Sequence, residues 1–350
     1  MEVFKVLEPG PFTTIQDAGR YGYQQFGIPV SGALDKFSFL AGNALVGNGD
    51  SDAVLEITFM GPRLEGLSDA LVAVTGADVP LFINGQPQTM WTSFRVRRGD
   101  IISMKAAVKG VRAYLAIAGG FDVPPIMGSR STYTGGKIGG LEGRPLAAGD
   151  ILHRELTDSF DRILSLPEDL QPTFGNRITL RALPGPQDDY FDTGLAVLFE
   201  AEFAVTSKAD CMGYRLEGPI IEPKAGAFRS IISEPSLSGS IQIPPDGCPI
   251  ILLVEQTVGG YAKIATIITP DLDSVAQARP GDKIRFARVD LTEAHRLYRD
   301  YRSRLGKLQH SLRGESSINC HCEEWNDEAI FIGGTGFQPI GVKIRVKCFR

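Results

Sequence analysis

The sequence lacks the features that secreted, membrane-spanning and nucleic-acid-binding proteins need. Charged residues such as Glu2, Lys5 and Asp17 occur throughout the N-terminal segment, so we expect no apolar signal-peptide core. No apolar run approaches the ~18 residues of a membrane-spanning helix. The net charge of −5 gives no electrostatic reason to bind nucleic acid or an anionic membrane, since both bind basic surfaces. We expect a cytoplasmic protein that binds neither nucleic acid nor a membrane.

Cysteine and histidine are also scarce. The five cysteines are an odd number and do not form a disulfide framework, so we expect reduced thiols. Only four histidines occur, and the compact group Cys320, His321 and Cys322 does not have the spacing of a zinc finger. We therefore expect no metal site.

Several familiar catalytic motifs are missing. Lys137 follows a glycine-rich stretch, but Ile138 stands where a P-loop needs Ser or Thr. Neither a G-x-G-x-x-G dinucleotide loop nor a G-x-S-x-G nucleophile elbow is present. Lys105 lies in Met-Lys-Ala, whereas a biotinylated lysine lies in a Met-Lys-Met turn. We expect no biotin attached to this chain.

What is present is a mainly β pattern over 350 residues, enough for two domains. Short apolar runs at residues 70–74, 94–96, 101–104, 113–118, 178–180, 250–254 and 283–286 predict strands, separated by Gly-Asp and Asn-Gly turns. R-L-E-G occurs at 63–66 and 215–218, which is compatible with two related halves. We predict β-barrel halves at 1–165 and 176–290.

Helices are few. Residues 36–45 and parts of 270–277 are predicted helices, and residues 291–312 have apolar side chains at three- and four-residue steps. This amphipathic helix either packs on the second barrel or binds a partner, and packing is the favoured interpretation. Residues 313–350 show neither the two-residue repeat of a strand nor the repeat of a helix. We expect this atypical tail to be peripheral or disordered.

Two glycine-rich loops in the first half carry polar side chains. Gln16, Asp17, Arg20 and Ser31 lie among glycines within residues 13–35, and Arg130 lies in G-S-R-S-T. Such loops can bind an anion, since an arginine binds a carboxylate or phosphate with two hydrogen bonds. The alternative is a network of structural turns.

The second half has polar residues within apolar strands. Tyr214 and Arg215 lie in M-G-Y-R-L-E-G, while Gln242, Gln256 and Lys263 lie in or beside apolar runs. A polar group buried without a partner costs ~1–3 kcal/mol, so these side chains are either hydrogen-bonded within the fold or bind a ligand. We favour the ligand.

These segments carry a resemblance. T-I-Q-D-A-G-R at Thr14, G-I-P-V-S-G-A-L-D at Gly27, and blocks beginning at Leu55, Tyr114, Gly128, Gly185, Met212, Gly239, Gln256 and Ala276 resemble the carboxyltransferase A/B family, also called allophanate hydrolase subunit 2. The family includes the C subunit of 5-oxoprolinase, KipA-like proteins and the carboxyltransferase part of urea carboxylase, which is a biotin-dependent enzyme. The resemblance covers about residues 3–289.

The resemblance implies two tandem cyclophilin-like β-barrels and a subunit that works with A-like and B-like partner subunits. Such a complex opens the lactam 5-oxoproline to glutamate with ATP, which the complex binds. The implied catalytic residues are Lys263, Arg215, Asp17 and Glu234, with Asp17 or Glu234 as the base. The implied substrate-binding residues are Gln16, Arg20, Ser31, Arg130, Tyr214, Gln242, Gln256 and Tyr261.

The chain departs from the family pattern at Cys211, Pro235, Cys248 and Ala262, where Arg, Gly, Gln and Pro are common. An altered activity is one consequence we consider. Two other functions remain open at this point. One is biotin-dependent carboxyl transfer to urea or a related amide, and the other is KipA-like regulation, in which the protein antagonises a kinase inhibitor without a substrate.

Overall fold

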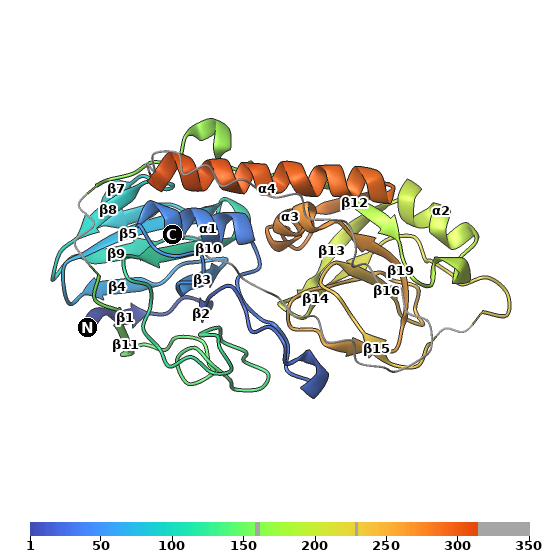
Figure 1. Ribbon diagram of the computed structural model, residues 1–350, viewed down its shortest axis with the longest axis horizontal. Helices are drawn as coiled ribbons and strands as arrows, with labels where there is room; N and C mark the ends of the chain where they lie inside the picture. Colours follow the sequence, from blue (N-terminus) through green and yellow to red (C-terminus); the bar gives the residue numbers. More distant parts are fainter. Residues whose placement is uncertain (158–161, 228–229, 314–350) are drawn as a thin grey trace, which may run out of the picture. The chain divides into compact units, whose positions relative to one another are not determined.

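Buried and exposed side chains alternate along the outer strands, which places one set in a core and the other on a surface, whereas the central strands are buried along almost their whole length. The structure is a computed structural model that describes residues 1–157, 162–227 and 230–313 (Figure 1). It confirms the mainly β prediction. The expectations for the tail beyond residue 313, and for the group at Cys320, lie outside the described residues.

The strands of the first half form two sheets that share a core. Val3, Leu55, Val74, Ile102 and Leu115 belong to that core. One sheet has the order β11 (Ile151–His153), β1 (Glu2–Glu8), β4 (Arg63–Gly66), β9 (Ile101–Met104), β6 (Leu81–Ile83) and β7 (Gln86–Gln88). The other has the order β2 (Phe12–Gln16), β3 (Val54–Thr58), β10 (Lys109–Ile117), β5 (Ala70–Asp78) and β8 (Ser93–Val96).

The second half is a closed barrel, as the resemblance implies. Its strands follow the order β12 (Arg177–Pro184), β19 (Ala262–Ile267), β16 (Ser240–Ile243), β17 (Ile250–Leu252), β14 (Gly213–Glu217), β13 (Glu202–Ala209) and β20 (Lys283–Arg288). The parallel pairing of β12 with β20 closes it. A separate two-stranded antiparallel sheet, β15 (Glu234–Pro235) and β18 (Val258–Gly259), lies outside the barrel order. We call this strand pair the hairpin for short, although β16 and β17 lie between its strands in the chain.

The predicted helices are confirmed. They are α1 (Lys36–Leu45), α3 (Leu272–Ala276) with the 3-10 turn η4 (Thr269–Asp271), and α4 (Leu291–Arg313); shorter 3-10 turns are η1 (Gln24–Phe26), η2 (Glu168–Leu170) and η3 (Asp188–Tyr190). The sequence analysis does not predict α2 (Thr193–Glu200), because a short apolar run is compatible with helix or strand. No helix among the described residues is both long enough and apolar enough to cross a membrane.

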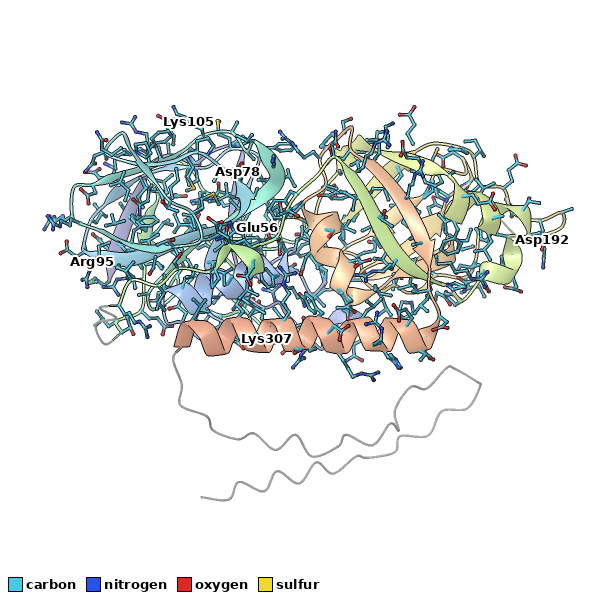
Figure 2. The ribbon with its side chains drawn as sticks, turned by 90° about the horizontal axis from the view of Figure 1, so that it is seen from above. Glu56, Asp78, Arg95, Lys105, Asp192 and Lys307 are labelled. Atoms are coloured by element: carbon cyan, nitrogen blue, oxygen red, sulfur yellow. The ribbon has the colours of Figure 1, made fainter. Side chains whose placement is uncertain are left out.

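Helix α4 contacts both halves, rather than the second barrel alone. Its Tyr301 hydroxyl donates to Asp273 of α3 at 2.8 Å, and the Arg304 guanidinium lies 4.3 Å from the ring of Phe37 in α1. Figure 1 shows α4 beside α1 and α3, and Lys307 marks the same helix in Figure 2. The apolar stripe of α4 is therefore used within the chain.

A buried arginine joins the two halves. Arg112 of β10 is 3% exposed, and its Nη1 donates to the Tyr214 hydroxyl and, at 2.6 Å, to the carbonyl of Ala276. Its Nε lies 3.6 Å from Oε1 of Glu56, which Figure 2 labels in the first half. Burial alone would lower the pKa of Arg112, but Tyr214, Cys211 and Glu56 raise it overall. The guanidinium therefore stays charged.

Gln277 completes this junction from the second half. Its Oε1 accepts from the backbone nitrogens of Val111 and Arg112 at 2.9 and 3.0 Å. Its Nε2 donates to Asp35 Oδ2 at 2.7 Å and to the carbonyl of Arg112 at 2.8 Å. One amide thus satisfies polar groups that the first half cannot pair by itself.

Two further titratable groups lie at the junction. The backbone nitrogen of Glu255 donates to the carbonyl of Cys211 at 3.0 Å. Burial raises the pKa of the Cys211 thiol to about 12, although Arg112 acts in the opposite direction. The thiol is therefore protonated at neutral pH and does not replace the cation that the family pattern places there.

Gln277→Leu should destabilise the fold strongly. The leucine leaves two buried N–H groups, a carbonyl and the Asp35 carboxylate without this partner, and each loss of that kind costs ~1–3 kcal/mol. We expect the free energy of unfolding in urea to fall by ~3–5 kcal/mol. Gln25→Leu, an identical change at an exposed position, should alter it little. Similar effects of both changes would contradict the role of Gln277.

Glu255→Gln should change how stability depends on pH. Burial, with the charges of Asp210 and Glu56, raises the pKa of Glu255 from 4.5 to about 7. The folded state binds this proton more tightly than the unfolded state, so its contribution is complete below about pH 4.5 and is lost as the pH rises through 7. The variant should therefore gain stability over the wild type at about pH 8, by at most ~3 kcal/mol, and much less at about pH 5.

Glu200→Gln on the exposed side of α2 is the matched control for that measurement. Thermal unfolding of the three proteins at both pH values decides the matter. An equal gain for Glu255→Gln at the two pH values would show that its carboxyl group does not titrate in this range.

Candidate functional site

The outer surface of the barrel carries a row of aligned side chains. The residues on either side of Gln242 belong to the barrel core, so Gln242 points outward. The strand register aligns Arg215 with Ile250, Ile250 with Gln242, and Gln242 with Lys263. Side chains paired in this way lie on one face of a sheet. Three of the predicted site residues therefore share one face, with Gln242 beside Lys263.

The hairpin of β15 and β18 covers one end of this row. Lys263 Nζ lies 2.5 Å from Glu234 Oε1 and donates to the carbonyl of Pro235 at 3.2 Å, and both acceptors belong to β15. A side chain at Gly259 of β18 would collide with the amide nitrogen of Gln242. Lys263 is 4% exposed as a result. The hairpin thus both holds and hides the ammonium group.

Gln187 fixes the geometry of the ion pair. It lies between β12 and η3, in the G-P-Q-D segment, and its Nε2 donates to Glu234 Oε1 at 2.9 Å. Its Oε1 accepts from the backbone nitrogen of Lys263 at 2.9 Å. The hydrogen bonds from Lys263 and then Gln187 lower the pKa of Glu234, against the effect of burial. Glu234 is thus held as a carboxylate.

Two polar groups near Lys263 have no hydrogen-bond partner among the described residues. They are Gln242 Nε2 and Ser236 Oγ, and each residue is 2% exposed. Most buried polar groups in proteins are paired, so such exceptions require an explanation. We call Lys263, Glu234, Gln187, Gln242 and Ser236 the Lys263 centre.

Other predicted residues of this half lie around the centre or away from it. Tyr261 precedes β19 and is 38% exposed, and Gln256 is partly exposed in the turn before β18. Arg215 forms an ion pair with Asp246 at the far end of the row, about three strand spacings or ~14 Å from Lys263. Tyr214 points into the barrel, where it accepts from Arg112.

The first-half candidates form a separate group, centred on Asp17. The Asp17 carboxylate accepts from the backbone nitrogens of Gly19 and Arg130 and from the hydroxyls of Ser129 and Ser131, at 2.5–2.8 Å. Every one of these donors belongs to the two glycine-rich loops. A carboxylate that accepts four hydrogen bonds has little capacity left for a substrate proton.

The arginines of this group are also engaged. Arg20 is fully buried, donates to the carbonyls of Ile126 and Ser131 at 3.0 and 2.9 Å, and retains an unpaired Nη1. Burial lowers its pKa, while the charge of Asp17 opposes that change. Arg130 forms an ion pair with Glu155. These contacts fit the structural alternative for both loops.

Gln16 and Ser31 complete the first-half group. Gln16 Nε2 donates to Thr14 Oγ1 at 3.0 Å and to the carbonyl of Thr132 at 3.1 Å, and its Oε1 accepts from Gly32 N at 3.2 Å. Ser31 has a φ of 54°, donates its backbone N–H to the carbonyl of Val254 at 3.0 Å, and has an unpaired hydroxyl. Ser31 therefore reaches the second half.

The structure brings together residues that sequence analysis did not select. Gln187 and Ser236 belong to the Lys263 centre, and Glu56 and Arg112 belong to the junction. A signal existed for two of them, since Glu56 and Arg112 are single charged residues within apolar strands. Gln187 and Ser236 lie in loops, where a polar residue attracts no notice.

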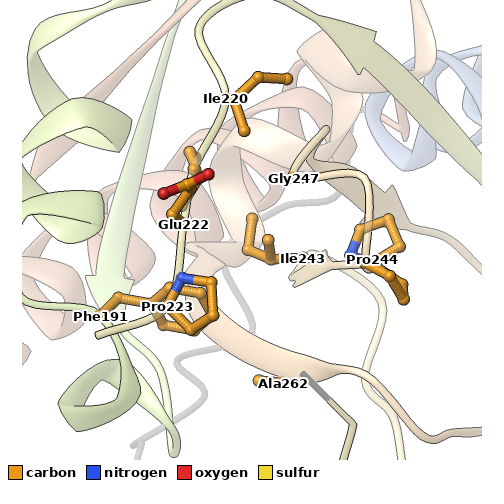
Figure 3. A pocket seen from close by; sticks show the side chains of 10 residues that line it. Phe191, Ile220, Glu222, Pro223, Ile243, Pro244, Gly247 and Ala262 are labelled. Atoms are coloured by element: carbon orange, nitrogen blue, oxygen red, sulfur yellow. The ribbon is translucent and has the colours of Figure 1, made fainter. Parts of the chain in front are cut away.

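A small cavity lies in the same barrel, as Figure 3 shows. It is lined by Phe191, Ile243, Ala262 and the Ile220–Pro223 segment, and it offers about 20 Å³ of accessible space. That space is enough for roughly one water molecule. Ile243 and Ala262 face inward, whereas their neighbours Gln242 and Lys263 face outward. This cavity therefore is not the place for a lactam.

A wider groove of about 570 Å³ lies in the first half, along β6, β7 and residues 171–174. Trp91, Phe82 and Phe174 contribute most of its apolar wall, and Asp78 and Lys109 are its charged residues. None of the predicted site residues lines it. Among the described residues, no group of three or more His, Cys, Asp or Glu side chains could bind a metal ion.

The Lys263 centre therefore has the chemistry of an anion-binding or oxyanion-stabilising site. An ammonium group and an amide donor lie side by side on a rigid strand pair, shielded from water by a hairpin. Donors fixed in such a position stabilise negative charge that develops on a substrate oxygen. Glu234 can accept or return a proton at the same place.

Known proteins are similar to this chain in sequence. The chain is 38% identical to the C subunit of 5-oxoprolinase of Escherichia coli (strain K12) over 318 residues, which are 90% of this chain and 100% of that protein. It is also 38% identical to the protein of the same name from Haemophilus influenzae, over 84% of this chain and 94% of that protein.

Solved structures agree. The crystal structure of K. lactis urea amidolyase superimposes with a TM-score of 0.82 at 31% identity, covering 87% of this chain and 20% of that one. The present chain thus corresponds to about a fifth of that larger enzyme. The family model for the carboxyltransferase domain, subdomain A and B, matches residues 26–288. Since that match spans most of the chain and every strand of the barrel, the protein belongs to the carboxyltransferase domain, subdomain A and B, family.

Proposed function

We propose that this chain is the C subunit of an ATP-dependent 5-oxoprolinase, which opens 5-oxoproline to glutamate with A-type and B-type partner subunits. The observation that carries the proposal is the Lys263 centre, a buried ammonium paired to Glu234 and flanked by an unpaired amide. The full-length similarity to the C subunits of 5-oxoprolinase from two bacteria supports it.

The chemistry of lactam opening makes use of such a centre. A lactam carbonyl is a poor electrophile, and phosphorylation of its oxygen at the expense of ATP creates a leaving group. Water then adds to the ring carbon, the carbon–nitrogen bond breaks as the ring nitrogen takes up a proton, and the resulting acyl phosphate is hydrolysed to glutamate and phosphate. The Lys263 ammonium stabilises the negative charge of the oxygens at the reacting carbon along this path. Glu234, held as a carboxylate by Lys263 and Gln187, accepts a proton from the attacking water. ATP is bound by the complex, and no biotin is attached to this chain.

The other predicted residues differ in how directly they act in this proposal. Gln242 contacts the substrate, and Tyr261 and Gln256 line the approach, since both are partly exposed beside the hairpin. Arg215 acts at a distance, because its guanidinium is paired with Asp246. Asp17, Arg20, Arg130, Gln16 and Ser31 hold the loops of the first half, and Tyr214 holds Arg112.

A second function has one observation in its favour. The chain is 32% identical to urea amidolyase of Saccharomyces cerevisiae, over 81% of this chain and 16% of that protein. Carboxyl transfer from biotin to urea would use the same oxyanion stabilisation, with biotin on another chain. Carboxylation of urea that depends on added free biotin would favour this second function over lactam opening.

Lys263→Ala should abolish most of the activity. We expect ATP-dependent release of glutamate from 5-oxoproline, measured on this chain co-purified with its A-type and B-type partners, to fall at least ~100-fold in kcat/KM, since one lost oxyanion donor costs about that much. Glu234→Gln should lower kcat similarly and KM little. Arg215→Ala should cost less than ~10-fold.

Lys105→Ala is the matched control, because Lys105 is an exposed lysine on the other half of the chain (Figure 2). Wild-type turnover in Lys263→Ala would remove the Lys263 centre from the reaction. A wild-type complex that forms but releases no glutamate would overturn the proposed substrate instead.

A further inference from the structure

The two unpaired polar groups of the Lys263 centre lie on facing surfaces, one on the outer face of the barrel and the other on the pair of strands that covers it. Gln242 is the register partner of Lys263 on the outer face of the barrel. In the covering hairpin, Glu234 and Ser236 are two residues apart, so both face the barrel, while Pro235 and Leu237 between and beyond them are exposed. The Ser236 nitrogen donates to Thr257 at 3.0 Å, which extends the hairpin ladder by one residue.

The hydrogen-bonding capacity between these two surfaces is mostly that of donors. An ammonium group has three N–H bonds, and the contacts of Lys263 Nζ within the described residues use two, to Glu234 and Pro235. Gln242 Nε2 adds unpaired N–H bonds, and the Ser236 hydroxyl can donate one more. A ligand that satisfies these groups must present acceptor oxygens, and the positive charge of Lys263 favours an anion.

We propose that Gln242, Ser236 and Lys263 form a subsite for the free carboxylate of a cyclic amino-acid lactam. The inference rests on the proposed function and names the group of the substrate that this side of the centre recognises. A carboxylate has two oxygens with about four acceptor positions, to which the unpaired N–H bonds of Gln242 and the Ser236 hydroxyl can donate, while the positive charge of Lys263 beside them favours the anion. Urea and other uncharged amides have no group for this subsite.

Entry to the subsite requires the hairpin to move. Gly259 lies directly against the Gln242 amide, and Pro235 and Glu234 close the space over Lys263. The hairpin ladder is only two residues long in each strand, and a short two-stranded ladder has little stability of its own. Gly259→Ala, at a position with an ordinary φ, places a methyl group where the Gln242 amide lies and so displaces that amide.

The test uses the complex of this chain with its A-type and B-type partners. In Gln242→Leu and in Ser236→Ala, the KM for 5-oxoproline should rise at least ~10-fold, since each loses a hydrogen bond to a charged group, while kcat changes less. With 2-pyrrolidinone, the same ring without the carboxylate, half-saturation of the stimulated ATP hydrolysis should change much less than the KM for 5-oxoproline, because no bond to a carboxylate is lost. Gly259→Ala should also raise the KM for 5-oxoproline.

Thermal stability separates a binding role from a structural one. An unpaired buried amide destabilises the free protein, so Gln242→Leu should leave the melting temperature unchanged or raise it. Gln86→Leu, an exposed position in β7, is the control for the substitution itself and should alter neither KM nor melting temperature. A lower melting temperature of Gln242→Leu together with a wild-type KM would show a structural role.

Inhibition by inorganic phosphate, the other oxyanion of the reaction, is the second measurement of this test. If the inhibition constant of phosphate rises in the variants while the KM for 5-oxoproline does not, the subsite binds phosphate and the carboxylate assignment fails. A wild-type complex that releases no glutamate overturns the proposed function itself. A working wild-type complex with both variants at the wild-type KM overturns the subsite alone.

Discussion

The buried guanidinium of Arg112 is the constraint on which the two halves of the protein depend. Removing a charge from water costs several kcal/mol unless partners replace the solvent. Arg112 belongs to β10 of the first half, but the hydroxyl and the carbonyl that accept from its Nη1 come from Tyr214 and Ala276 of the second. Neither half can bury this charge satisfactorily without the other.

The junction shares apolar packing as well as charge. Leu34, which precedes α1 in the first half, belongs to the core cluster of the second-half barrel. Its backbone nitrogen donates to Glu56 at 2.9 Å, so the same segment connects the apolar core to the carboxylate beside Arg112. The barrel is therefore held in a fixed relation to α1, and α4 adds the contact of Tyr301 with Asp273.

Hydrogen-bond saturation marks Asp17 and Gln277 as structural groups. Asp17 accepts four hydrogen bonds, and Gln277 makes four, so little of their capacity remains for a ligand. Unpaired polar atoms occur at Gln242 and Ser236, and also at Arg20 and Ser31 of the first half. What distinguishes Gln242 and Ser236 is the buried ion pair of Lys263 with Glu234 beside them, which supports the Lys263 centre as the candidate site.

The sequence predicted the elements better than the contacts. The period of residues 36–45 and 291–312 predicted α1 and α4, and the apolar runs predicted the strands, because these patterns are local. Gln242 and Lys263 were selected for being polar within apolar strands, and the register then placed them side by side. Glu234 was named as a possible base from the family resemblance alone, and its ion pair with Lys263 was not predicted, since Glu234 lies in a segment with no periodic pattern. Gln187 was missed because its role depends on a contact across 76 residues of sequence.

The departures from the family pattern act on the same centre in different ways. Ala262 faces the barrel core, so its side chain does not reach Lys263. Pro235 differs, because its carbonyl accepts from Lys263 and therefore points away from β18. The neighbouring Ser236 donates its backbone N–H across the ladder, so Pro235 lies at a position where the ladder needs no N–H. Lys263 holds the hairpin to the barrel through Glu234 and the Pro235 carbonyl. In the proposed subsite, a substrate carboxylate beside Lys263 would compete for the ammonium group that holds the hairpin, so one ion pair would couple binding to opening.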